Sequence, residues 1–437
     1  MNVLPASTPD NADAPHKPGR EVVQALTAAT RVLFIDGETT RRLVLAVERL
    51  GHALGVDVVV SPRWGEVTLR FSDPAASRLE WIDVTPLGVD MHKVAEANEL
   101  IDKVCANAIG LDEVRAQLAA IQHLPPVSLA RFVLLTAAGA AALGVIFGAA
   151  QWLTLGLIAF GAGAGALLRR WLATLGNNPF AQPFGAALLA GIIGAIVARF
   201  QLAPMPYLVA VCPCMVLVPG PHFLNGAIDL ARTRVALGAC RIAYASLITL
   251  VISVGLLAGL SLGGLDLPAS SPAGIVPLGY DVIAAGVAVA AYGTFFAMPW
   301  RMLPIPIVIG MLAHASRWLV IVPGGGSAET GALVACVLVG AIVTPVADRL
   351  RMPFAAFAFA SVVSLIPGVY IFRMAGGLLK LIAPGRGPSP DLMLGIMVDG
   401  ATALLIIVAM AFGLIVPKLA IEFLFPKLIH PKLAATE

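Results

Sequence analysis

The sequence predicts a polytopic α-helical membrane protein with about ten spans in two inverted five-helix repeats, preceded by a small N-terminal α/β cytoplasmic domain. Three observations support this fold class. Hydrophobic residues make up 58% of the 437 residues and charged residues only 13%, whereas soluble domains carry about 25% charged residues. Long apolar runs follow one another from about residue 131 onward. The two halves of this apolar region also share short motifs in the same order.

The N-terminal end is expected to be a disordered tail, residues 1–29. Its first 20 residues are rich in Pro, Asp, Asn and Ser, a composition that cannot bury a core. No basic stretch followed by an apolar one is present there, so the sequence predicts no signal peptide. The domain that follows is therefore expected to stay in the cytoplasm.

Residues 30–126 read as this cytoplasmic α/β domain. Apolar residues at helical spacing predict a helix over 37–54, and the alternation of Val67, Leu69 and Phe71 with polar residues predicts a strand over 66–71. The remaining expected elements are strands over 56–60 and 81–84 and helices over 90–106 and 111–123.

Pro125 and Pro126 separate this domain from the membrane region. A first membrane repeat is expected over 127–265, a second over 266–418 and a cytoplasmic tail over 419–437. The predicted spans are 131–150, 152–169, 182–199, 203–218, 241–261, 279–298, 303–321, 330–346, 353–367 and 392–416. With this topology most of the Lys and Arg residues of the loops fall on the cytoplasmic side, as expected of a multi-pass protein of a bacterial plasma (inner) membrane.

The internal repeat appears as matched motifs. Residues 194–197 and 340–343 share the sequence Gly-Ala-Ile-Val, and a short span in each half ends in Pro-Gly, at 219–220 and at 367–368. A polar, basic loop is expected after each Pro-Gly. Five spans per repeat force the two halves into opposite orientations, the inverted arrangement of many secondary transporters, which bind substrate between their repeats. Because membrane proteins without transport activity can also be duplicated, a membrane scaffold remains an alternative.

The two Pro-Gly pairs are the predicted substrate-binding elements. Proline interrupts the helical hydrogen bonds, glycine tolerates the resulting backbone, and a broken helix exposes amide and carbonyl groups to a ligand. An ordinary loop start is the alternative interpretation. An amino-acid substrate also needs a cationic and an anionic partner, and side chains of both charges occur near the Pro-Gly pairs in the sequence. The predicted substrate-binding residues are Pro219, Gly220, Asn225, Asp229, Pro367, Gly368, Tyr370 and Arg373.

Asp399 is the predicted proton-coupling residue. It lies seven residues inside the last predicted span, and carboxyl groups within a membrane are costly and usually functional. The alternative is an acid near the outer interface of a span that begins later. His314, in the seventh span, is a weaker candidate, and Asp281 reads as a charge at a helix end.

Other classes of function find little support. The triplet Cys212-Pro213-Cys214 resembles the metal site of heavy-metal pumping ATPases, but the chain lacks their Asp-Lys-Thr-Gly motif. No phosphate-binding loop or hydrolase motif is visible, so we expect no enzyme, metal or cofactor. Charges gather at the ends of apolar runs rather than on one basic face, which argues against nucleic acid. The expected partners are a small polar metabolite, protons and the lipid bilayer, and a homo-oligomer is left open.

Several motifs together resemble the threonine/serine exporter family over about residues 30–418. They are Asp-Gly-Glu-Thr-Thr-Arg-Arg at 36–42, the region 83–103, Leu-Val-Pro-Gly at 217–220 with Asn225 and Asp229, and Ile-Pro-Gly-Val-Tyr at 366–370 with Arg373. The resemblance implies a cytoplasmic domain, ten spans and export of threonine or serine, driven by the proton gradient. Some relatives are associated with dicarboxylates, so a small-dicarboxylate exporter is the alternative within the family.

Overall fold

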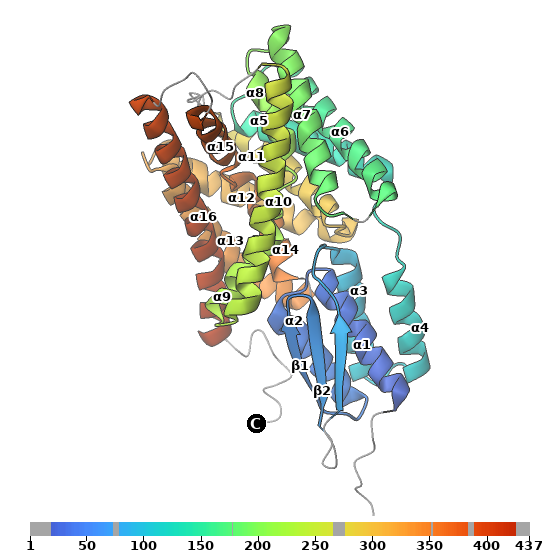
Figure 1. Cartoon of the computed structure of the whole chain (residues 1–437). Helices are drawn as coiled ribbons and strands as arrows, with labels where there is room; N and C mark the ends of the chain where they lie inside the picture. The colour runs from blue at the N-terminus through green and yellow to red at the C-terminus, as the bar shows by residue number, and fades with distance from the viewer. Residues whose placement is uncertain are drawn as a thin grey trace, which may run out of the picture.

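The structure, a computed structural model, describes residues 19–72, 78–176, 178–264, 276–350, 353–382 and 389–424, without the side chain of residue 382. It is mostly helical, and a small α/β domain lies at one end of a long helical bundle (Figure 1). Residues 1–18 and 425–437, which belong to the two predicted tails, lie outside the described residues.

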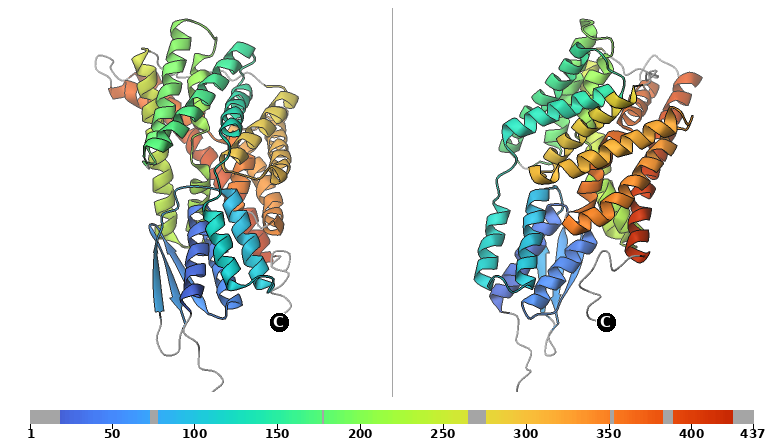
Figure 2. Two further views of the ribbon diagram at one scale, coloured as in Figure 1. Left: turned by 90° about the vertical axis from the view of Figure 1, so that its right-hand side faces the viewer. Right: turned by 180° about the vertical axis from the view of Figure 1, so that it is seen from behind.

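The N-terminal domain combines four helices with a three-stranded antiparallel sheet in the order β1-β2-β3. Val60 pairs with Leu69 and Val67 pairs with Ile82, so apolar side chains of successive strands share one face of the sheet. The helices of the domain lie on one side of the sheet (Figure 2). The apolar face of the sheet and the apolar stripes of these helices form one buried core. The elements are α1 (Arg20–Ile35), α2 (Thr40–Ala53), β1 (Val58–Arg63), β2 (Glu66–Phe71), β3 (Arg78–Asp83), α3 (Met91–Cys105) and α4 (Leu111–Gln122).

The domain begins earlier than the sequence predicted. Residues 20–29, assigned to a disordered tail, form the first part of helix α1. Val23, Leu26 and Leu33 are buried in the domain core, at the spacing of one face of a helix. The prediction of a tail rested on the polar composition of the first 20 residues. It was extended to residue 29 and so missed the apolar residues that recur at helical spacing from Val23 onward.

Eight helices of the described chain are long and apolar enough to cross a membrane, and two bent helix pairs raise the number to as many as ten. The eight are α5 (Leu129–Ile146), α6 (Trp152–Leu175), α7 (Ala181–Arg199), α10 (Val235–Leu262), α11 (Leu278–Phe295), α12 (Pro304–Ile321) preceded by η1 (Trp300–Met302), α13 (Ala328–Leu350) and α16 (Pro390–Leu424). The bent pairs are α8 (Pro206–Met215) with α9 (Gly220–Ala231), and α14 (Phe354–Val362) and η2 (Val363–Leu365) with α15 (Gly368–Ile382).

Two expectations about the membrane region need correction. The segments after the two Pro-Gly pairs are helices α9 and α15 rather than polar loops. Their polar residues lie on one side of an otherwise apolar helix, which local composition does not distinguish from a loop. Helix α16 also continues to Leu424 and so includes residues 419–424 of the predicted tail. An ion pair between the buried Lys418 and the partly buried Glu422 lies in this last part of the helix.

Helix packing in the two halves of the bundle follows the same pattern. Helix α5 packs on α6 as α11 packs on α12, α7 packs on α10 as α13 packs on α16, and α9 packs on α10 as α15 packs on α16. Glycines allow close contacts in two of these pairs, Gly259 against α7 and Gly413 against α13, because small residues let helices approach closely in lipid. Between the halves, α5 packs on α11, α9 on α14, and α8 on α15.

The N-terminal domain is docked directly on the bundle. The Met91 amide donates a hydrogen bond of 2.8 Å to the Phe296 carbonyl, just after the end of α11. The Met91 side chain belongs to the core of the bundle, and Leu237 of α10 belongs to the core of the domain. The two parts therefore share buried contacts as well as a covalent connection.

Candidate functional site

The two Pro-Gly pairs form sharp breaks between helices. Helices α8 and α9 meet at 53°, and α14 and α15 meet at 66°. In each break the glycine amide bonds the carbonyl two residues earlier, Gly220 to Val218 at 2.9 Å and Gly368 to Ile366 at 2.8 Å. This bond closes a three-residue turn around the proline, whose ring already prevents a continuous helix. The same local chemistry thus builds both breaks, here called break 1 (217–220) and break 2 (365–368).

The breaks are packed against the opposite half of the bundle. A Cβ atom added at Gly220 would lie 1.5 Å from Cζ of Phe359 in α14, and one added at Gly368 would lie 2.7 Å from Cγ of Met215 in α8. A side chain at Gly220 would therefore overlap the Phe359 ring, and one at Gly368 would have to displace the Met215 side chain. The Met215 carbonyl, released at the end of α8, accepts a 2.7 Å hydrogen bond from the hydroxyl of Tyr292. In this conformation side chains fill the space beside both breaks.

Break 2 leads into a largely buried ion pair. Arg373 of α15 contacts Asp399 of α16 through two hydrogen bonds, from Nε to Oδ2 at 3.0 Å and from Nη2 to Oδ1 at 2.6 Å. The Asp399 residue is only 3% exposed, and the Arg373 guanidinium carbon lies 5.7 Å from the centre of the Tyr370 ring. Two-point pairing of this kind is strong and orients both groups. The structure thus brings together three predicted site residues.

The predicted residues of helix α9 face the N-terminal domain instead. The side-chain amide of Asn225 donates to the Gly37 carbonyl at 3.3 Å, and the hydroxyl of Thr40 donates to Asp229 Oδ2 at 2.9 Å. Arg241 of α10, itself 1% exposed, places its Nε 3.3 Å from the same carboxylate oxygen. Helices α9 and α15 lie toward opposite ends of the bundle (Figure 1). Asp229 and Arg373 are therefore not brought together as two poles of one substrate site.

Residues 36–42, here called the docking segment, hold the N-terminal domain to the bundle. Arg41 pairs with Glu422 of α16 at 2.9 Å, and the same carboxylate contacts Arg232 of α9. Arg42 donates to the Ala347 carbonyl of α13 at 3.3 Å. At the start of the segment, burial raises the pKa of Asp36 to about 7, although nearby Lys93 lowers it. The segment thus reaches three membrane helices that are distant in sequence.

The structure also reveals a polar chain that the sequence did not assign. Asp281 Oδ2 lies 2.9 Å from Nδ1 of His314, and Nε2 of His314 lies 2.6 Å from Oγ of Ser364. The sequence singled out His314 only as a weak proton candidate and interpreted Asp281 as a charge at a helix end. The sequence did show that each of these polar residues lies within an apolar run, which often indicates function. It could not show that the three side chains meet, because that depends on how each helix is rotated about its axis.

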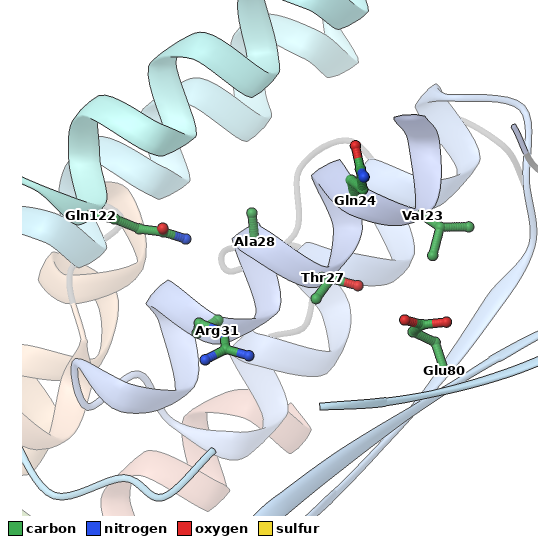
Figure 3. A pocket seen from close by; sticks show the side chains of 7 residues that line it. All are labelled: Val23, Gln24, Thr27, Ala28, Arg31, Glu80 and Gln122. Carbon is green, nitrogen blue, oxygen red and sulfur yellow. The ribbon is translucent and has the colours of Figure 1, made fainter. Parts of the chain in front are cut away.

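A surface hollow lies elsewhere, on the N-terminal domain. It has a volume of about 360 Å³ and opens between α1, β3 and α4. Figure 3 shows its polar lining, with Arg31 and Gln122 on one side and Glu80 on the other. No residue of either break lines it, so it is separate from the candidate substrate site.

Comparison with known protein families gives two matches that together span the domain and both halves of the bundle. One model, of a threonine/serine exporter, matches residues 24–263. A second, described as "Threonine/Serine exporter, ThrE", matches residues 281–420. No solved structure matches the chain significantly.

Proposed function

The chain belongs to the threonine/serine exporter family, and from this premise we propose that it is a proton-coupled secondary exporter of threonine or serine. Members of this family are membrane transporters rather than enzymes. The proposed setting is a bacterial plasma (inner) membrane, with the N-terminal domain in the cytoplasm. The observation that carries the proposal is the two-point ion pair between Arg373 and Asp399 beside break 2.

This ion pair has the two charges that a zwitterionic amino acid needs. The guanidinium of Arg373 can donate to the substrate carboxylate, and the carboxylate of Asp399 can accept from the substrate ammonium. In the described conformation each group satisfies the other, so the pair must open as substrate binds. This pairing favours a substrate role for Asp399 over the proton-coupling role predicted from the sequence.

The breaks would supply the rest of the site. We propose that the backbone of Pro219, Gly220, Pro367 and Gly368 offers hydrogen-bonding groups when the breaks move apart, and that Tyr370 covers the Arg373 side. Met215 and Phe359, which fill the space in the described conformation, would limit the substrate to a small side chain. The matched packing of α5–α10 and α11–α16 supports an inverted repeat whose halves alternate around this site.

The experiment is counterflow in proteoliposomes that contain the full chain, with labelled threonine, serine and succinate tested in parallel. We expect threonine or serine to exchange, and we expect Arg373→Gln and Asp399→Asn each to reduce exchange at least tenfold. The matched control is Arg199→Gln, which removes an exposed arginine at the end of α7 and should leave exchange unchanged.

Each other outcome points to a different function. Exchange of succinate alone would still identify a transporter, but one that exports dicarboxylates. Such a substrate has no ammonium group, so a cationic side chain in the site would be enough to bind it. No exchange of any of the three by folded, inserted protein would contradict the proposal and favour a membrane scaffold whose N-terminal domain recruits a partner.

A further inference from the structure

A buried chain of three polar side chains connects the start of α11 to break 2. It runs from Asp281 through His314 of α12 to Ser364 of η2, with contacts of 2.9 Å and 2.6 Å. The three residues are 3%, 0% and 3% exposed. Ser364 lies directly before break 2. Burying a carboxylate and an imidazole within a membrane region is costly, and such groups usually serve function.

The chain lies on the side of the bundle remote from the N-terminal domain. Helix α11 ends beside the domain, where the Phe296 carbonyl bonds Met91, and Asp281 is in the first turn of the same helix. At 1.5 Å per residue the two points are separated by about 22 Å along the helix. Asp281 therefore lies at the end of α11 that is far from the domain, and the chain leads from there to break 2.

Further charged and titratable groups surround His314. Arg317, one turn along α12, is close enough to Asp281 and to Tyr370 of α15 to interact with both electrostatically. From α13, Gly331 lies against the Arg317 side chain, and Glu329 is in the same first turn. From the α14 side, Ser364 is the contact of His314. Tyr370 in turn lies beside Arg373, so the chain borders the proposed substrate site.

At the matching place in the first half of the bundle, a valine replaces the serine of this chain. Ser364 is three residues before Pro367, and the residue three before Pro219 is Val216. Break 1 nevertheless forms the same proline-centred turn as break 2. The hydroxyl is therefore not required to make a break, which points to a task beyond folding.

We propose that Asp281, His314 and Ser364 form the relay that carries the coupling proton to and from break 2. This inference rests on the proposed exporter function. With His314 neutral, its Nδ1–H donates to Asp281 and its Nε2 accepts from the Ser364 hydroxyl. When break 2 opens to water, a proton arriving at the Ser364 oxygen releases the hydroxyl's own proton to Nε2. The products are an imidazolium, which faces the Asp281 carboxylate, and an intact serine. Reversal of the same steps releases the proton.

Protonation also changes the hydrogen bonds at break 2. Nε2–H of the imidazolium becomes the donor toward Ser364, so the serine hydroxyl must turn to another acceptor. Binding of one proton thus changes which hydrogen-bonding groups at break 2 have a partner inside the protein. That difference between the two protonation states links proton binding to the conformation of the break.

The test separates exchange from coupled transport by the full chain in proteoliposomes. Threonine–threonine exchange needs no net proton movement, whereas uphill accumulation driven by an imposed pH gradient does. The variants are His314→Gln, Asp281→Asn and Ser364→Ala. The matched control is Ser361→Ala, since Ser361 is also buried but its hydroxyl, among the described residues, donates to the Phe357 carbonyl of its own helix.

We expect His314→Gln to retain at least a third of the exchange rate and to lose gradient-driven accumulation at least tenfold. Ser364→Ala should lose accumulation several-fold, and Ser361→Ala should match the wild type. If His314→Gln does not fold, as judged by gel filtration, the comparison of Ser364→Ala with Ser361→Ala decides the question.

Three results would overturn the relay. One is normal accumulation by His314→Gln and Ser364→Ala. Another is equal loss of exchange and accumulation in folded variants, which would assign the residues to substrate binding or to packing. A third is covalent labelling of Ser364 by a fluorophosphonate, which would indicate a hydrolytic Asp-His-Ser triad. A wild type that exchanges neither threonine nor serine would instead contradict the exporter function itself.

Discussion

At the scale of single residues, the sequence pointed to candidate functional residues better than to the residues that they contact. Arg373 and Asp399 were both singled out, but as a substrate ligand and a proton carrier rather than as one ion pair. The role proposed for Asp281 and Ser364 depends on their contacts with His314, which lies 33 and 50 residues away from them. Contacts between helices depend on how each helix rotates about its axis, and one sequence contains no direct record of that rotation.

Asp36 provides a prediction for pH dependence. Burial raises its pKa from 3.8 to about 7, so the folded chain holds this proton more tightly than the unfolded chain. The free energy of unfolding should therefore fall as pH rises from about 4 to 7, and its Asp36 contribution should level off above that range. We expect the loss of thermal stability between pH 5.5 and pH 8 to be smaller in Asp36→Asn than in the wild type.

The measurement is thermal unfolding of the full chain in detergent at several pH values. Asp83→Asn, which changes an exposed carboxyl of β3, serves as the control and should keep the wild-type slope. An Asp36→Asn variant with that same slope would contradict a titrating Asp36.

At the scale of elements, the sequence predicted long apolar helices well and amphipathic ones poorly. The separation of α5 from α6 was expected, and Gly148, with φ of 92°, lies in the turn between them. Helices α9 and α15 were predicted as loops because their polar residues, including Asp229 and Arg373, suggested solvent. Those residues are in fact paired inside the protein, and this environment exists only after the chain has folded.

The breaks allow a graded test of packing. Gly220→Ala should destabilise the chain by about 1–3 kcal/mol, because the new methyl group would overlap the rigid Phe359 ring. Gly368→Ala should cost less, since the flexible Met215 side chain can adapt. Gly156→Ala in α6, where a Cβ would meet nothing within 4 Å, should be neutral or slightly stabilising. Thermal unfolding in detergent provides the ranking, and equal effects at the three positions would contradict the close approach.

At the scale of the whole molecule, the docking segment makes the N-terminal domain part of the transporter. Asp229→Asn keeps a partner for Thr40 but leaves the buried Arg241 without this counter-charge. We expect a loss of about 3–5 kcal/mol in stability and earlier proteolysis between domain and bundle, with the KM of exchange within twofold of the wild type. Asp57→Asn, an exposed change in the domain, is the control. A large rise in KM at wild-type stability would return Asp229 to the substrate site.

The crossed contacts of the breaks bear on how tightly the membrane stays sealed. Phe359 of the second half lies against Gly220 of the first, and Met215 of the first lies against Gly368 of the second. Neither helix pair can straighten without displacing a side chain that belongs to the other. In the proposed exporter, neither break would therefore open without a movement in the other half, and this coupling would limit leakage of an ion gradient through the empty carrier.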